Sequence, residues 1–196
     1  MAIGRPRTFD LDEAVAAVLP LFIEKGFEGA TFGQLIATMG INPPSFYAAF
    51  GSKEQLFQRV IDLYAAHCAL ILEDALAQPT AYQVVERLLR TTADAVTDQM
   101  RPAGCLFVQG ALSCSDKATG LRADLATRRQ AVEPVLAERL RAAQASGDKS
   151  ISDNPVKVAL FVSVMLSGLA VRASSGGDRR TLHDVVDVAL EGLRAL

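Results

Sequence analysis

The side chains with the most reactive chemistry in this sequence are three cysteines and two histidines. Cys105 stands at a predicted helix start, where the helix dipole lowers the pKa of a thiol and favours the nucleophilic thiolate. Cys114 follows nine residues later. On one straight helix this spacing would put the two thiols on opposite faces, roughly 13 Å apart along the axis, which is too far for a disulfide. A buried structural cysteine is the safer interpretation for Cys105, and more so for Cys68 and Cys114.

The histidines, His67 and His183, do not complete a metal site with these thiols. Neither has a metal-ligand spacing to a cysteine, and the neighbours His67 and Cys68 point about 100° apart on a helix. A small helical enzyme that uses Cys105 or Cys114 with a histidine is one alternative function. Nothing supplies a third, orienting group, and no Gly-rich phosphate loop or paired carboxylate motif supports it. The sequence predicts no metal and no cofactor.

A second set of residues has the spacing of two short helices joined by a tight turn. Thr31 can cap the first helix, and Gly40 can end it because glycine readily takes positive φ. Asn42 can cap the next helix, with Pro43 in its first position, where no N–H is needed. The pattern predicts a helix-turn-helix, whose short second helix is shaped to enter a major groove. A helical hairpin in any all-α protein is the alternative.

Several motifs in the first third of the chain together match a known family. They are Gly4-Arg5-Pro6-Arg7, Phe22, Lys25-Gly26-Phe27, Thr31, Met39-Gly40-Ile41, Ser45-Phe46-Tyr47, Phe50 and Lys53-Glu54-Gln55-Leu56-Phe57. Through them, the sequence from Gly4 to Tyr64 resembles the DNA-binding region of the TetR family of bacterial repressors. The resemblance implies a three-helix DNA-binding head, followed by a larger all-α domain that pairs two subunits and holds an inducer. The rest of the chain matches mainly in length and helical pattern.

The same resemblance implies which residues contact double-stranded operator DNA. Arg5 and Arg7 lie on an arm from which guanidinium groups can reach the minor groove or phosphates. Thr31 and Lys53 stand at helix N-termini, which suit phosphate. The remaining contacts are the phenol of Tyr47, the base-facing Pro43, Pro44, Ser45 and Ala48, and Gln34 as a further candidate. The alternatives are pure helix capping for Thr31 and a core ring for Tyr47.

Helical periodicity and turn residues predict an all-α protein of about nine helices. We expect a helix-turn-helix DNA-binding domain over residues 1–52 and an α-helical inducer-binding and dimerisation domain over residues 53–196. One long helix is expected over about 121–145. Pro20 should bend the first helix, because a proline inside a helix removes one backbone hydrogen bond.

The last two predicted helices are suited to pair with a second subunit. The first runs from residue 155 to about 173 and is apolar on nearly every side, so it needs burial all round. A chain of 196 residues can cover only part of that surface. We therefore predict a homodimer through these two helices, as the family resemblance also implies. A central core helix of a monomer is the alternative.

The resemblance also implies a small-molecule inducer, and an apolar pocket would suit a largely apolar molecule. The pocket candidates are His67, Tyr82, Cys105, Phe107 and Met165. For His67, a satisfied core histidine is the alternative. The run Gly104-Cys105-Leu106 resembles one found in some members that sense electrophiles or oxidants through that cysteine. A thiol-sensing repressor of the same fold is therefore an alternative function.

Composition limits how the protein could bind DNA and where it resides. The net charge is −2, so there is no bulk positive charge, and DNA binding would rest on a few placed contacts and on dimer avidity. A helical adaptor that binds protein is the alternative from a different class. The chain shows no signal peptide, no apolar run long enough for a bilayer and no paired cysteine framework, which predicts a cytoplasmic protein without membrane contact.

Overall fold

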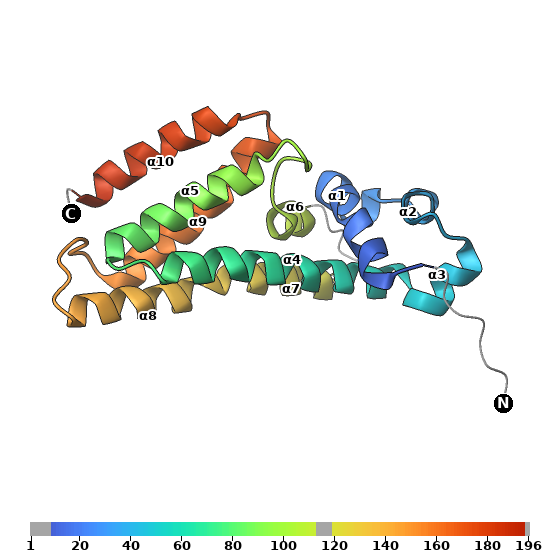
Figure 1. Cartoon of the computed structure of the whole chain (residues 1–196), viewed down its shortest axis with the longest axis horizontal. Helices are drawn as coiled ribbons and strands as arrows, with labels where there is room; N and C mark the ends of the chain where they lie inside the picture. Colours follow the sequence, from blue (N-terminus) through green and yellow to red (C-terminus); the bar gives the residue numbers. More distant parts are fainter. Residues whose placement is uncertain (1–8, 113–118, 195–196) are drawn as a thin grey trace.

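The computed structural model describes residues 9–112 and 119–194, and within these ranges it is all-α with no strand, as predicted. The helices are α1 (Leu11–Gly29), α2 (Phe32–Met39), α3 (Pro43–Phe50), α4 (Lys53–Leu76), α5 (Ala81–Val96), α6 (Leu106–Leu112), α7 (Thr119–Gln130), α8 (Val132–Ala145), α9 (Pro155–Ser174) and α10 (Arg179–Arg194). Figure 1 shows α1 to α3 at one end of the molecule, with α4 running from this head along its length.

The predicted helix over about 121–145 is divided in two. Only Ala131 separates α7 from α8. If this pair is counted as one helix, the described residues form the expected nine helices. Pro134 explains the break, because it lacks the N–H that would bond the carbonyl of Gln130 and its ring crowds that carbonyl. The sequence analysis overlooked this proline.

Local capping sets the ends of α1. The Asp10 carboxylate accepts hydrogen bonds from the backbone N–H groups of Asp12 (2.8 Å) and Glu13 (3.1 Å). Inside α1 the backbone leaves helical angles at Gly26, where φ is 66°. The interruption therefore lies at Gly26, and the backbone at Pro20 keeps helical angles.

Two hydrophobic cores are built along α4. The head core gathers the buried faces of α1, α2 and α3 around the first half of α4, with Phe22, Phe46 and Phe57 among its largest side chains. It also includes Leu106 of α6 and Leu125 of α7, so it reaches beyond residue 52. The second core lies between α5, α8, α9, α10 and the end of α4. The division at residue 52 stays a prediction.

Helix α9 is the central helix of this second core. It packs against both α5 and α8. Its 20 residues also make it long and apolar enough to cross a membrane by length and composition, although one such helix is weak evidence because soluble core helices pass the same test. The sequence alone predicted no apolar run long enough for a bilayer, because Ser163, Ser167 and Gly168 interrupt its longest apolar stretch over residues 158–171. What identifies α9 as a core helix is its packing.

Candidate DNA-binding head and ligand cavity

The ends of α2 and the start of α3 are formed as their residue types predict. The Thr31 hydroxyl accepts the N–H of Gln34 (3.3 Å), while the Gln34 side chain accepts the N–H of Thr31 (3.1 Å), which completes a capping box. Gly40 ends α2 in the left-handed conformation with φ of 64°. Asn42 caps α3 by accepting the N–H of Ser45 (2.9 Å), and Pro43 follows in the first turn. The result is the predicted helix-turn-helix.

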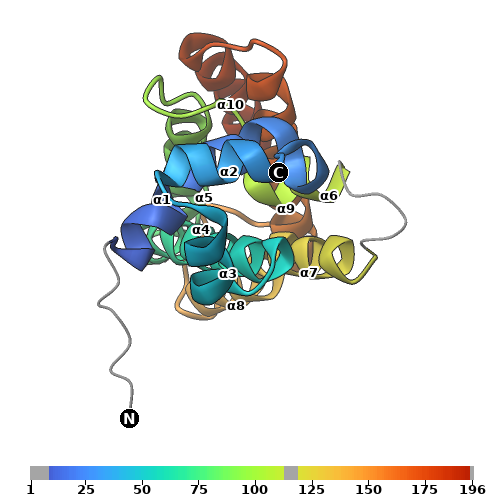
Figure 2. The same ribbon diagram turned by 90° about the vertical axis from the view of Figure 1, so that its right-hand side faces the viewer.

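Helix α3 turns its phenylalanines inward and its small residues outward. Phe46 and Phe50 are buried in the head core. The exposed or half-exposed side of α3 carries the predicted DNA contacts Pro43, Pro44, Ser45, Tyr47 and Ala48. Seen from the head end in Figure 2, α2 and α3 lie toward the viewer, at the end of the molecule.

Tyr47 has a supported ring and a free face. Its ring stacks on Phe32, with the centroids 5.5 Å apart, and meets the edge of Phe46 at the same separation. The side chain is nevertheless 57% exposed. Its aromatic neighbours fix the ring direction without burying it, so Tyr47 is not a core residue.

The other predicted DNA contacts differ from one another in their surroundings. Lys53 is the first residue of α4, and its ammonium lies over the Phe27 ring, 4.7 Å from the centroid. Burial lowers the pKa of Lys53, although Glu54 and Glu28 oppose this effect. Gln34 is engaged in the capping box with Thr31. Arg5 and Arg7 lie outside the described residues.

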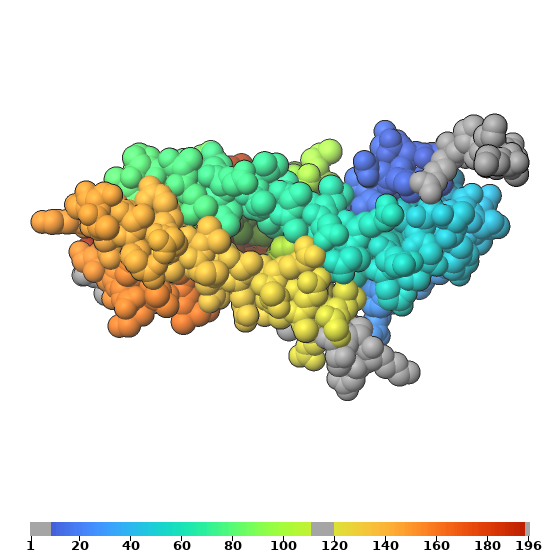
Figure 3. All heavy atoms as spheres, turned by 90° about the horizontal axis from the view of Figure 1, so that it is seen from below, coloured from blue at the N-terminus to red at the C-terminus, as the bar shows by residue number. Residues whose placement is uncertain are grey.

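A cavity of about 380 Å³ lies beside α4 in the larger part of the molecule. Its lining comes from the middle of α4, the second half of α5, the start of α6, the junction of α7 with α8, and α9. Figure 3 shows the surface hollowed between α4 and the α7–α8 pair. The walls are mostly apolar, with Leu72, Leu88, Val96, Phe107 and Leu166 among them. Such a space suits a small and largely apolar molecule.

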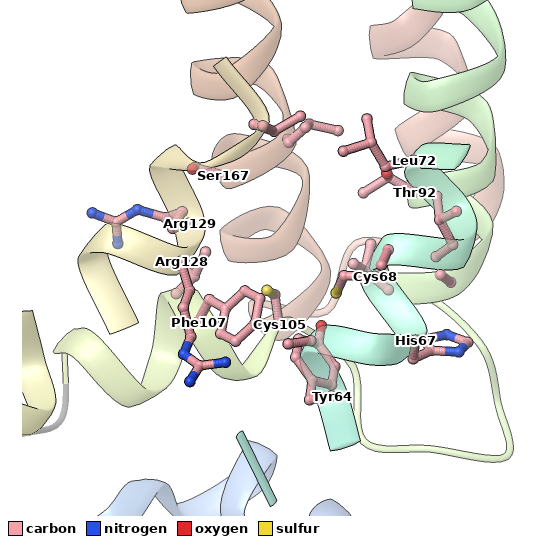
Figure 4. A pocket seen from close by; sticks show the side chains of 18 of the residues that line it. Tyr64, His67, Cys68, Leu72, Thr92, Cys105, Phe107, Arg128, Arg129 and Ser167 are labelled. Carbon is pink, nitrogen blue, oxygen red and sulfur yellow. The ribbon is translucent and has the colours of Figure 1, made fainter. Parts of the chain in front are cut away.

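Tyr64, Cys68 and Cys105 point toward one another at one end of the cavity (Figure 4). Burial raises the pKa of Tyr64, and the nearby thiols add to the shift. Burial, with a smaller contribution from Cys105, raises the pKa of Cys68 to about 12, although a hydrogen bond from Tyr64 opposes it. Burial and the charge of Arg101 lower the pKa of His67, which also lines the cavity. These shifts favour the neutral forms of the Tyr64 phenol, the Cys68 thiol and the His67 imidazole.

The structure brings three of the five predicted pocket residues to this cavity, namely His67, Cys105 and Phe107. Tyr82 lies elsewhere, in the first turn of α5, where its ring receives the guanidinium of Arg194 at 4.3 Å. Met165 lines a different groove, between α9 and α10. Neither Tyr82 nor Met165 lines the cavity, because each lies on the side of its helix that faces α10.

Several lining residues were missed by the sequence analysis. Tyr64, Cys68 and Leu72 recur at four-residue spacing on α4, and that spacing was the signal that they share one face. Thr92 comes from α5 and Ser167 from α9, and only the packing of these helices brings them to α4. The described residues hold no cluster of three or more metal-ligating side chains. Cys114 lies outside the described residues.

The capped α2–α3 pair, with an exposed recognition helix at one end of an all-α protein, defines a helix-turn-helix DNA-binding protein. Residues 15–60 match the family model described as "Bacterial regulatory proteins, tetR family". The Escherichia coli K12 repressor BdcR is 31% identical over 98% of this chain and 93% of its own length, and the repressor ComR of the same strain is 26% identical over 95% and 90%. This chain therefore belongs to the TetR family of transcriptional regulators.

A solved relative supports the same assignment. The TetR family regulator CifR, in a cysteine mutant complexed with 26-bp double-strand operator DNA, superimposes with a TM-score of 0.91 at 36% identity, covering 97% of this chain and 100% of CifR. The likeness thus extends over the cavity beside α4 as well as the head.

Proposed function

We propose that this chain is a homodimeric repressor that binds a near-palindromic operator and is released by a largely apolar small molecule. The observation that carries the proposal is the helix-turn-helix with its exposed α3, in a chain similar over its full length to an operator-bound regulator. In a dimer, the two copies of α3 would bind two operator half-sites in successive major grooves.

Tyr47 supports the DNA-binding part of the proposal. Its ring direction is fixed by Phe32 and Phe46, so its hydroxyl is pre-oriented at the exposed surface of the head. The other proposed contacts are Arg5, Arg7, Thr31, Gln34, Pro43, Pro44, Ser45, Ala48 and Lys53. α3 carries no Arg, Asn or Gln, so base reading would rest on Ser45, on methyl contacts with thymine and on DNA shape.

Selection of bound sequences from a random double-stranded DNA pool tests this part. We expect recovery of a near-palindrome at moderate salt and weaker recovery at high salt. A matched pair of variants then tests the surface, since Tyr47→Phe and Tyr82→Phe each remove one hydroxyl. Tyr47→Phe should weaken binding to the selected duplex by about threefold to tenfold, equivalent to a lost hydrogen bond, while Tyr82→Phe should not. Failure to enrich any sequence with folded protein would refute the proposal.

The homodimer is supported by the apolar residues that α9 and α10 leave exposed. They are Val156, Leu160, Phe161, Val164 and Val171 on α9 and Val185 and Val188 on α10. Figure 1 shows α10 at the outer edge of the molecule, away from the head. Exposed apolar side chains gathered on two neighbouring helices are typical of a protein interface, and a second copy of the chain would cover them.

A pair of charged substitutions tests the dimer. Val164 on α9 is 62% exposed and Leu70 on α4 is 65% exposed, so glutamate costs each a similar amount in a monomer. In sedimentation at micromolar concentration we expect the unchanged protein and Leu70→Glu to sediment at twice the chain mass. Val164→Glu should sediment as a monomer, because it would bury a charge in the interface. Equal masses for both variants would contradict an interface at α9.

The cavity beside α4 is the proposed inducer site. α4 lines the cavity with its middle and joins the head with its first half. A ligand that binds better to the conformation with separated heads would draw the dimer away from the operator. Because the lining is mostly apolar, the inducer should be largely apolar too.

An environment-sensitive dye with a large aromatic part and one sulfonate, 1-anilinonaphthalene-8-sulfonate, can report on this site. Thr92 lines the cavity and Thr91 faces a neighbouring polar groove, although they adjoin on α5. Thr92→Phe should fill part of the cavity and weaken dye binding at least fivefold, whereas Thr91→Phe should leave it unchanged. Equal dye affinity in both variants would refute the assignment of the cavity.

A further inference from the structure

Two thiols face each other across one end of the ligand cavity. Cys68 projects from α4, Cys105 is the residue before α6, and their side chains point toward one another with the Tyr64 hydroxyl beside both (Figure 4). Tyr64 is hydrogen-bonded with each of the two sulfurs. Both cysteines are free and half-buried. The sequence analysis considered only Cys105 with Cys114, so this pairing comes from the packing of α4 against α6.

Cys105 also has an unusual position between the two hydrophobic cores. It packs against the head core and against the core of the larger domain. It follows Gly104, a glycine with φ of 120° at the end of the α5–α6 connection. A covalent bond at Cys105 would thus form where the two cores meet. Cys105 itself lies at the end of the loop that connects α5 to α6.

We propose that Cys68 and Cys105 form a reversible disulfide that closes this end of the cavity and regulates the ligand site. The regulatory part rests on the proposed function, since it takes the cavity to be the inducer site. The oxidant is a peroxide. Overall, two thiols and one hydrogen peroxide give one disulfide and two waters, so the thiols lose two protons and two electrons and the peroxide O–O bond is reduced.

The order of the steps follows from the surroundings of each thiol. Because its raised pKa keeps Cys68 protonated at neutral pH, Cys105 is the first to attack. Its sulfur displaces one peroxide oxygen as water and becomes a sulfenic acid. The Cys68 sulfur then attacks that sulfur, the S–S bond forms, and the hydroxyl leaves as water with the Cys68 proton. Tyr64 positions both sulfurs through its hydroxyl.

The bond would change the protein because it requires a shorter approach than two free thiols. A disulfide holds its two sulfurs about 2 Å apart, which is closer than two unbonded sulfurs can approach, so its formation would draw the start of α6 toward α4. Since α6 packs against α1 of the head, the movement would reach the DNA-binding helices. It would also narrow the cavity between Cys105 and Leu72.

Mass-spectrometric mapping tests the bond itself and needs neither DNA nor ligand. The full-length protein is treated with hydrogen peroxide at a small molar excess, alkylated and digested. We expect a Cys68–Cys105 cross-link, two hydrogens lighter than the separate peptides, in the unchanged protein and in Cys114→Ser. Cys68→Ser should leave Cys105 without this cross-link. A Cys105–Cys114 bond, a bond between subunits or Cys105 oxidised without a partner would overturn the proposal.

Dye binding then tests whether the bond regulates the site. Oxidised Cys114→Ser should bind 1-anilinonaphthalene-8-sulfonate at least fivefold more weakly than the reduced form, with recovery after dithiothreitol. Cys68→Ser, or Cys68→Ala if the serine variant does not fold, should bind equally in both states. If the bond forms and dye affinity is unchanged, regulation of the site is refuted. If the random DNA pool yields no operator, the repressor function fails while the mapped bond still stands.

Discussion

Replacing Gly40 by alanine should destabilise the head, because the turn between α2 and α3 requires a left-handed backbone at this residue. Its φ and ψ are 64° and 30°, and its N–H bonds to the carbonyl of Ala37 at 3.2 Å. A Cβ built at Gly40 meets no atom within 4 Å. No steric clash is therefore involved, and the cost comes from the backbone conformation alone.

Gly33 provides a matched control for the magnitude. It lies in the first turn of α2 without a positive φ, and its added Cβ also meets nothing within 4 Å. Alanine reduces the entropy of the unfolded chain at both positions, which stabilises by about 0.4–1 kcal/mol. At Gly40 the left-handed conformation costs about 1–2 kcal/mol in addition. The net effects are a gain of about 0.4–1 kcal/mol for Gly33→Ala and a loss of about 0–1.6 kcal/mol for Gly40→Ala.

Urea unfolding followed by circular dichroism measures both effects. All proteins are compared at one concentration, so that any contribution of dimerisation to the free energy of unfolding is the same. The two variants should differ by about 1–2 kcal/mol, with Gly40→Ala the less stable. If Gly40→Ala is as stable as Gly33→Ala, the left-handed backbone at residue 40 does not require glycine, and the prediction is refuted.

Three further predictions concern single contacts. Asn42→Ala should lower the free energy of unfolding by about 0.5–2 kcal/mol, because α3 loses its cap. Asn42→Asp should retain most of the stability of the unchanged protein in the same urea assay, because a carboxylate can accept the same N–H. Arg139→Lys should cost about 1 kcal/mol, because the guanidinium donates to the carbonyls of Leu76 (3.0 Å) and Gln78 (2.6 Å) at the end of α4. Burial tends to raise the pKa of Asp94, but hydrogen bonds led by that from His183 lower it overall. Its stabilisation is thus present above the unfolded pKa of about 3.9 and lost as pH falls through the lower folded pKa. Urea titrations between about pH 5 and pH 2 should show a flatter loss of stability for Asp94→Asn, and an unchanged slope would exclude this role.

The helix ends of the head could be predicted because their causes are local. Thr31 and Asn42 each accept a backbone N–H three residues further on, an interaction that depends only on nearby sequence. Gly40 takes positive φ for an equally local reason. The break between α7 and α8 has an equally local cause in Pro134, so it too could have been predicted from the sequence.

The cavity depends on contacts between helices far apart in the sequence. Residue type correctly suggested His67, Cys105 and Phe107 as cavity residues. Whether a side chain points into a cavity depends on helix packing, which residue type does not reveal. The prediction therefore wrongly placed Tyr82 and Met165 in the cavity. The sequence by itself determined the helices, their caps and the DNA-binding motif, because hydrogen bonds within a few residues decide them. Only the tertiary structure decided which faces meet, and so placed the thiol of Cys68 opposite that of Cys105 and left one face of α9 uncovered.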